Sequence, residues 1–77
     1  SEHEIIWMHL LLSWGNVMLG DKEKSLVHVR KAANFLGGEW SHEGPFDDPI
    51  LRIFLGSMWR LNDRWEEARV EFRKAYY

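Results

Sequence analysis

The stretch LGSMWRLNDRWEEARVEFRKA, residues 55–75, decides how this chain folds. Apolar residues recur in it at helical spacing on both sides of Asn62 and Asp63, which are turn residues. It therefore predicts a hairpin of two helices. Its last part, VEFRKA at 70–75, echoes VHVRKA at 27–32, forty-three positions earlier. The echo predicts a second hairpin in the N-terminal half.

The N-terminal half has the helix and turn signals that this second hairpin needs. Residues 3–19 read as a helix that is apolar on several sides, so several neighbours must cover it. Gly20 suits the positive backbone angle that ends a helix, and Asp21 is a cap for a helix over Lys22–Leu36. That helix is expected to bury Leu26, Val29, Ala33 and Leu36.

The C-terminal half begins with another start signal. Asp48 is a cap and Pro49 is suited to the first helical position, so a third helix is expected from here to about Leu61. Asp63 and Glu66 form the pattern of a capping box for a fourth helix, which runs to the C-terminus.

The fold class is therefore all-α, two antiparallel helix hairpins (four helices) in a single domain of residues 1–77. Repeat 1 covers about 3–36, a loop covers 37–47, and repeat 2 covers about 48–77.

The second hairpin carries a specific pattern: Leu55-Gly56-x-x-Trp59, then Ala68-x-x-x-Phe72, then Ala75. This pattern resembles the tetratricopeptide repeat (TPR). The resemblance implies a fragment of a right-handed, TPR-like solenoid.

The first hairpin is a more diverged copy when the two are aligned on their glycines. Gly15 to Ser25 spans ten positions where Gly56 to Ala68 spans twelve, which predicts a turn two residues shorter and Ser in place of Ala. Because glycine inside a helix is destabilising by about 1 kcal/mol relative to alanine, Gly15 and Gly56 are both expected where two helices approach closely.

The resemblance to tetratricopeptide repeats implies a non-catalytic protein–protein interaction module or scaffold. The first helix of each repeat would line a groove that accepts a partner peptide or helix. Eight residues fall at the implied groove positions: His9, Leu12, Asn16, Leu19, Ile50, Ile53, Ser57 and Arg60. Of the clamp that some members use for a C-terminal carboxylate, only Asn16 is present, so we expect no such clamp.

Self-association is the alternative. The many-sided apolar helix needs cover, and the net charge is −4 over residues 1–48 and +2 over residues 49–77. A homodimer or a fragment of a longer repeat array would satisfy both features. Residues 3–32 and 47–77 also resemble the repeat region of uncharacterised bacterial envelope lipoproteins, which implies the cell envelope or periplasm rather than the cytoplasm.

The loop 37–47 has two open interpretations. Trp40 and Phe46 are either anchors of a binding loop or plugs that fold back on the hairpin junction.

Several function classes are not expected. A net charge of −2 is far from the basic surface of a nucleic-acid binder. No Cys is present and no two of the four His have the spacing of a helical metal site, so neither metal nor cofactor is expected. Without a phosphate loop or a catalytic cluster we expect no enzyme. The one apolar segment, residues 5–19, is too short and too polar for membrane insertion.

Overall fold

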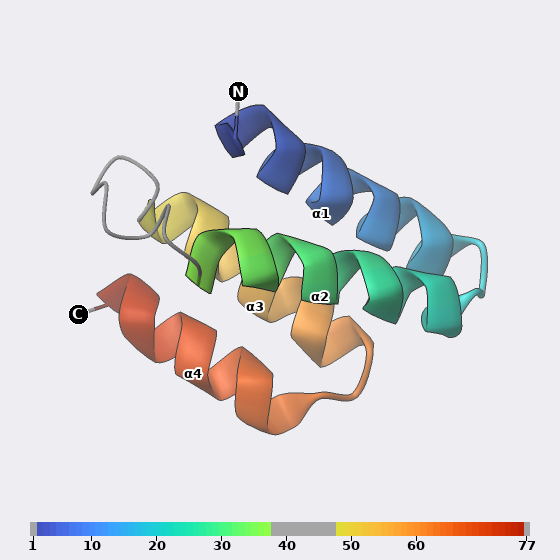
Figure 1. The fold of residues 1–77 in the computed structure, drawn as a ribbon. Coiled ribbons are helices and arrows are strands. Elements are labelled where there is room, and N and C mark those ends of the chain that lie inside the picture. The colour runs from blue at the N-terminus through green and yellow to red at the C-terminus, as the bar shows by residue number, and fades with distance from the viewer. Residues whose placement is uncertain (1, 38–47, 77) are drawn as a thin grey trace.

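The computed structural model describes residues 2–37 and 48–76, and four helices account for most of them (Figure 1). The helices are α1 (Glu2–Met18), α2 (Lys22–Gly37), α3 (Pro49–Leu61) and α4 (Trp65–Tyr76). α1 packs with α2, and α3 packs with α4. The predicted all-α fold of two helical hairpins is confirmed.

The second hairpin docks on the first through α3, which lies against both α1 and α2 (Figure 1). Helix α2 ends at Gly37, one residue later than predicted. The predicted anchors Trp40 and Phe46 lie outside the described residues.

The turn between α1 and α2 is built as the sequence predicts. Gly20 has φ 83°, and its N–H donates to the Val17 carbonyl at 3.1 Å. The next N–H, of Asp21, donates to the Asn16 carbonyl at 2.8 Å, which completes a Schellman motif. The Asp21 carboxylate then accepts from the Lys24 N–H at 3.0 Å and caps α2.

The start of α3 is also as predicted. Asp48 has extended backbone angles, its carboxylate accepts from the Ile50 N–H at 2.9 Å, and Pro49 occupies the first helical position. Proline fits there because the first N–H groups of a helix have no intrahelical partner.

The capping box predicted from Asp63 and Glu66 is wrong. Asp63 has φ 61° and belongs to the end of α3, where its N–H donates to the Arg60 carbonyl at 2.9 Å. Aspartate tolerates this left-handed conformation better than most residues. Its carboxylate contacts Lys22 Nζ at 3.0 Å instead of the first turn of α4.

Arg64 is the residue that precedes α4. Its carbonyl accepts from the Ala68 N–H at 3.0 Å, and its guanidinium donates to Glu67 Oε2 at 3.0 and 2.7 Å. These hydrogen bonds to Arg64 are the main reason why the pKa of Glu67 is lowered.

The two hairpins correspond position by position at a constant offset of 43 residues. Both helix pairs are joined by three residues, 19–21 and 62–64. Gly20 and Asp63, which are 43 apart, both have positive φ. The prediction of a shorter first turn is therefore wrong, and Gly56 corresponds to Ser13 rather than to Gly15.

A close approach of helices exists at Gly56 and not at Gly15. A Cβ on Gly56 would lie 2.7 Å from Phe72 Cε1, so this prediction is confirmed. A Cβ on Gly15 would meet nothing within 4 Å, so the prediction there is wrong. In the first hairpin the counterpart of Gly56 is Ser13, whose hydroxyl forms a buried hydrogen bond of 2.9 Å with the hydroxyl of Ser25.

The core runs through both hairpins. Its buried apolar residues are Ile6, Leu10, Val29, Ala32, Leu36, Leu51, Leu55, Met58, Trp59 and Ala68. Of the four residues that α2 was expected to bury, Val29 and Leu36 are fully buried, whereas Leu26 and Ala33 are partly buried against the core. Ala32 is fully buried as well, because α2 packs against both α1 and α3 and so buries a wider face.

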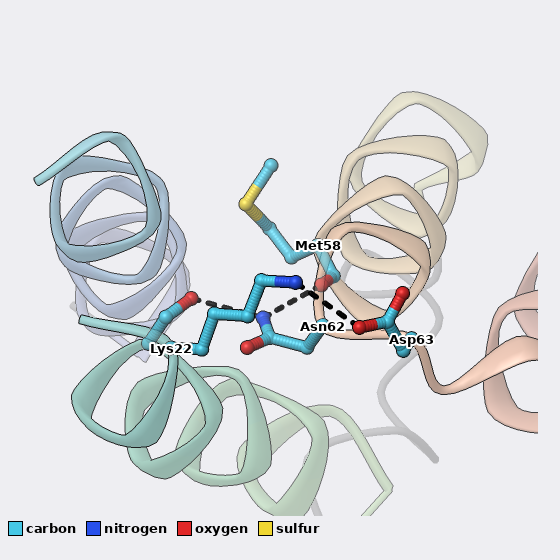
Figure 2. Close-up of polar contacts among 5 residues, drawn as sticks. Lys22, Met58, Asn62 and Asp63 are labelled. Atoms are coloured by element: carbon cyan, nitrogen blue, oxygen red, sulfur yellow. Dashed lines mark hydrogen bonds and ion pairs between the residues drawn. The ribbon is translucent and has the colours of Figure 1, made fainter. Parts of the chain in front are cut away.

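Polar groups also join the two hairpins (Figure 2). The buried Asn62 amide donates to the Met58 carbonyl at 2.9 Å and to Ser25 Oγ on α2, also at 2.9 Å. Nearby, Lys22 and Asp63 form the exposed ion pair already described. Asn62 thus fixes the end of α3 against the first turn of α2.

Candidate functional site

The predicted groove residues fall into two groups in the structure. The exposed ones are Leu12, Leu19, Ile50, Ile53 and Arg60. The partly buried ones are His9, Asn16 and Ser57.

Each partly buried groove residue already has a hydrogen-bond partner. Asn16 donates to the Leu12 carbonyl at 2.8 Å, and Ser57 donates to the Ile53 carbonyl at 2.8 Å. His9 faces α2 rather than solvent, with its Nδ1 3.0 Å from Nδ1 of His28. That the eight residues form one groove stays a prediction.

An apolar surface on α1, which we call the outer face, is formed by Met8, Leu11, Leu12, Gly15 and Leu19. Its side chains are exposed, and all of its residues except Gly15 are large and hydrophobic. Met8, Leu11 and Leu12 also line a surface hollow of about 630 Å³, together with His3, Glu4 and Trp7. Unlike a scattering of single apolar residues, a contiguous patch of this kind is typical of an interaction surface.

The residues of α3 that correspond to the outer face are covered by the first hairpin. They are, in order, Leu51, Phe54, Leu55 and Met58, followed by Asn62, which caps the C-terminal end of α3. Leu51 and Leu55 are 0% exposed, whereas their counterparts Met8 and Leu12 are 48% and 41% exposed. At the end of the series, Asn62 is 9% exposed and Leu19 is 84% exposed.

The difference has a simple origin. The first hairpin covers this face of α3, and within residues 2–37 and 48–76 no helix covers the same face of α1. Phe54 illustrates the contact, because its ring packs edge-on against Trp7 and Trp14, with centroid distances of 5.3 and 6.3 Å. Leu11, at the corresponding position of α1, is 54% exposed.

Sequence reasoning found part of the outer face. It identified Leu12 and Leu19 as binding residues but not Met8 or Leu11. The echo of VHVRKA and VEFRKA carries the offset of 43 that pairs Met8 with Leu51 and Leu11 with Phe54, but the different exposure of these pairs is visible only in the structure. Alignment on Gly15 hid that offset.

A second hollow lies on the side of the second hairpin that α4 shares with α3. Its volume is about 400 Å³, and it is lined by Arg60, Trp65, Glu66, Ala68, Arg69 and Phe72. The Arg60 guanidinium lies over the Trp65 ring, 4.9 Å from the centroid. Ile50 and Ile53 are also exposed on α3.

In each hairpin one polar pair joins the two helices, and the two pairs occupy corresponding positions. Arg52 and Glu71 are both buried, with Nη1 2.7 Å from Oε1. Their counterparts, 43 positions earlier, are His9 and His28. In the histidine pair one Nδ1 donates and the other accepts, so at least one ring is neutral when the bond forms.

His9 has a perturbed pKa that follows from this position. Burial lowers its pKa first, and the nearby charges of His28 and Lys31 lower it further. His9 also stacks near Phe35, with ring centroids 6.1 Å apart. The pair is therefore part of the packing of α1 on α2.

Among residues 2–37 and 48–76, no three His, Cys, Asp or Glu side chains gather where they could hold a metal ion. None of the helices in those two ranges has the length and hydropathy needed to cross a bilayer.

Comparisons with known proteins return no relative: no protein-family model matches the chain, and no curated protein or solved structure is significantly similar to it.

Proposed function

We propose that this chain is a non-catalytic, TPR-like interaction module that binds a helical partner against the outer face of α1. One observation carries the proposal. Met8, Leu12 and Leu19 are exposed at positions whose counterparts in α3 are buried by a packed hairpin. Because α3 uses this face to pack against the first hairpin, the same face of α1 is suited to pack against another helical unit.

The energetics favour such a contact. Burying a side chain of the size of leucine or methionine stabilises a complex by about 1.5–3 kcal/mol. Four apolar side chains lie on the outer face, and their helix is already folded against α2, so little ordering opposes binding. A helix laid against an apolar helical surface is a common mode of recognition.

Site-specific photo-crosslinking tests the proposal. A benzophenone amino acid replaces Leu12 in one variant and Val27 in the control, and each variant is irradiated in an extract of its source cells. Val27 is a matched control because it is 44% exposed and its counterpart Val70 is also exposed, at 48%. The repeat therefore indicates no partner at Val27.

The expected result is a discrete adduct from position 12 that is absent from position 27. Mass spectrometry of the adduct should identify an amphipathic helical segment. Adding Leu19→Glu should abolish the adduct, because the charge falls in the same contact. Equal labelling from positions 12 and 27, or an adduct that survives Leu19→Glu, would contradict the proposal.

A further inference from the structure

The partner of the outer face can be identified from what the same face meets inside the chain. On α3, Phe54 packs against Trp7, and Asn62 donates to Ser25. The residues 43 positions after Trp7 and Ser25 are Ile50 and Ala68. These positions belong to the second hairpin.

The receiving side of the second hairpin is open in the described structure. Ile50 is 68% exposed and Trp65 is 58% exposed, and Ala68, itself only 2% exposed, lines the hollow of about 400 Å³ beside Trp65 and Phe72. We call this surface the open side, defined by Ile50, Trp65, Ala68 and Phe72. The open side occupies the positions in the second hairpin that correspond to the surface of the first hairpin against which α3 packs.

The chemistry of the two surfaces matches. Inside the chain, the polar Asn62 meets the polar Ser25. At the corresponding positions of the outer face and the open side, the apolar Leu19 would meet the apolar Ala68. Both members of the pair have changed from polar to apolar, so contact between Leu19 and Ala68 would bury no unpaired polar side chain at this position.

The charges match as well. The charged residues of α1 are Glu2 and Glu4, both acidic, whereas the hollow of the open side is lined by Arg60 and Arg69 with one acid, Glu66. The acidic α1 of one copy would therefore attract the open side of another, and two α1 helices would repel each other.

We propose that the outer face of α1 binds the open side of the second hairpin in another copy of this chain, head to tail. This inference rests on the proposed function and names its partner. Because donor and acceptor surfaces differ, the contact is heterologous, and each added copy leaves one surface of each kind free. Assembly therefore continues beyond a dimer as concentration rises.

Two single variants and their mixture test the geometry. Leu11→Glu blocks the outer face, and Ile50→Glu blocks the open side. Leu11 corresponds to Phe54, so it would lie against Ile50 of the next copy. Both residues are exposed, and Glu suits the first turn of α3, so circular dichroism should show both variants folded.

Sedimentation equilibrium over a hundredfold range of concentration gives the readout. The wild type should rise from 9.2 kDa to several times that mass, and each variant should stay near 9.2 kDa, with at least tenfold weaker association. An equimolar mixture of the two variants should form a one-to-one dimer. In the mixture the outer face of the Ile50→Glu chain can still bind the open side of the Leu11→Glu chain. The reverse contact is blocked, because it would place two glutamates together.

The other outcomes are distinct. A wild type that stays at 9.2 kDa up to about 1 mM overturns the second copy as partner, while an adduct from position 12 to another protein would still support the proposed function. In another outcome, Leu11→Glu abolishes association, Ile50→Glu leaves it intact, and mixing the two variants does not restore it. That result would indicate that two outer faces bind each other, and it would overturn the head-to-tail arrangement. Failure of both sedimentation and crosslinking overturns both proposals.

Discussion

The same substitution, glycine to alanine, should change stability in opposite directions at the two helical glycines. At Gly15 an added Cβ meets nothing within 4 Å, so only the conformational effect remains. Alanine in a helix is favoured over glycine by about 0.5–1 kcal/mol. Gly15→Ala should therefore raise the free energy of unfolding by that amount, or the melting temperature by about 4 °C in a domain of this size.

At Gly56 the new methyl group enters occupied space. Its Cβ would lie 2.7, 2.8 and 3.1 Å from Cε1, Cδ1 and Cζ of Phe72. Forcing an extra carbon into a packed site costs about 1–3 kcal/mol, which outweighs a gain of about 1 kcal/mol in helix propensity. Gly56→Ala should therefore lower the free energy of unfolding by about 1 kcal/mol.

A double-mutant cycle isolates the contact. Phe72→Val places at position 72 the residue that the first hairpin has at the corresponding position, Val29. In that background Gly56→Ala should become stabilising by about 1 kcal/mol, a coupling of about 2 kcal/mol with Phe72. Urea unfolding followed by circular dichroism, at a protein concentration too low for association, measures all four variants. Equal stabilisation by alanine at positions 15 and 56 would refute the reasoning.

Three further predictions concern single side chains. Glu71→Ala removes the carboxylate from the buried Arg52 and should cost about 3 kcal/mol in urea unfolding, whereas Glu66→Ala, which removes an exposed ion pair, should cost less than about 1 kcal/mol. The pKa of His9 is lowered in the folded state, so the unfolded chain binds more protons; thermal melts should show stability falling as the pH drops below about 6.5, and His9→Asn should lessen that fall. Asp48→Ala removes the cap of α3 and should lower the free energy of unfolding by about 1 kcal/mol; no change would contradict the cap.

Much of the fold follows from local signals that the sequence shows openly. Gly20 and Asp21 marked one turn, and Asp48 and Pro49 marked the start of α3, because each residue acts on backbone groups within a few positions. Asp63 misled because the same residue type serves as a cap and as a left-handed residue that ends a helix. Which role it takes depends on where α3 stops, and that is set by packing.

The correspondence of the hairpins was harder to see for a different reason. Glycine and alanine at 56 and 68 are replaced by two serines at 13 and 25, which approach closely through a buried hydrogen bond. Hydrophobic periodicity does not reveal buried polar residues, so the sequence pattern pairs Gly15, rather than Ser13, with Gly56. The error moved the expected binding positions of α1 by two residues, because an offset of 43 from Ile50, Ile53, Ser57 and Arg60 gives Trp7, Leu10, Trp14 and Val17. Neither alignment gives Met8 or Leu11, whose exposure follows from the packing of the helices.

An intermolecular paramagnetic relaxation experiment tests the head-to-tail contact most directly. The chain has no Cys, so Ile5→Cys at the edge of the outer face gives a single nitroxide site. The labelled chain is mixed with ¹⁵N-labelled, spin-free chain, and broadening of the amide signals is mapped. We expect broadening of the residues around Ile50, Trp65 and Ala68. Broadening confined to α1, or none at concentrations where the chain associates, would contradict the proposed contact.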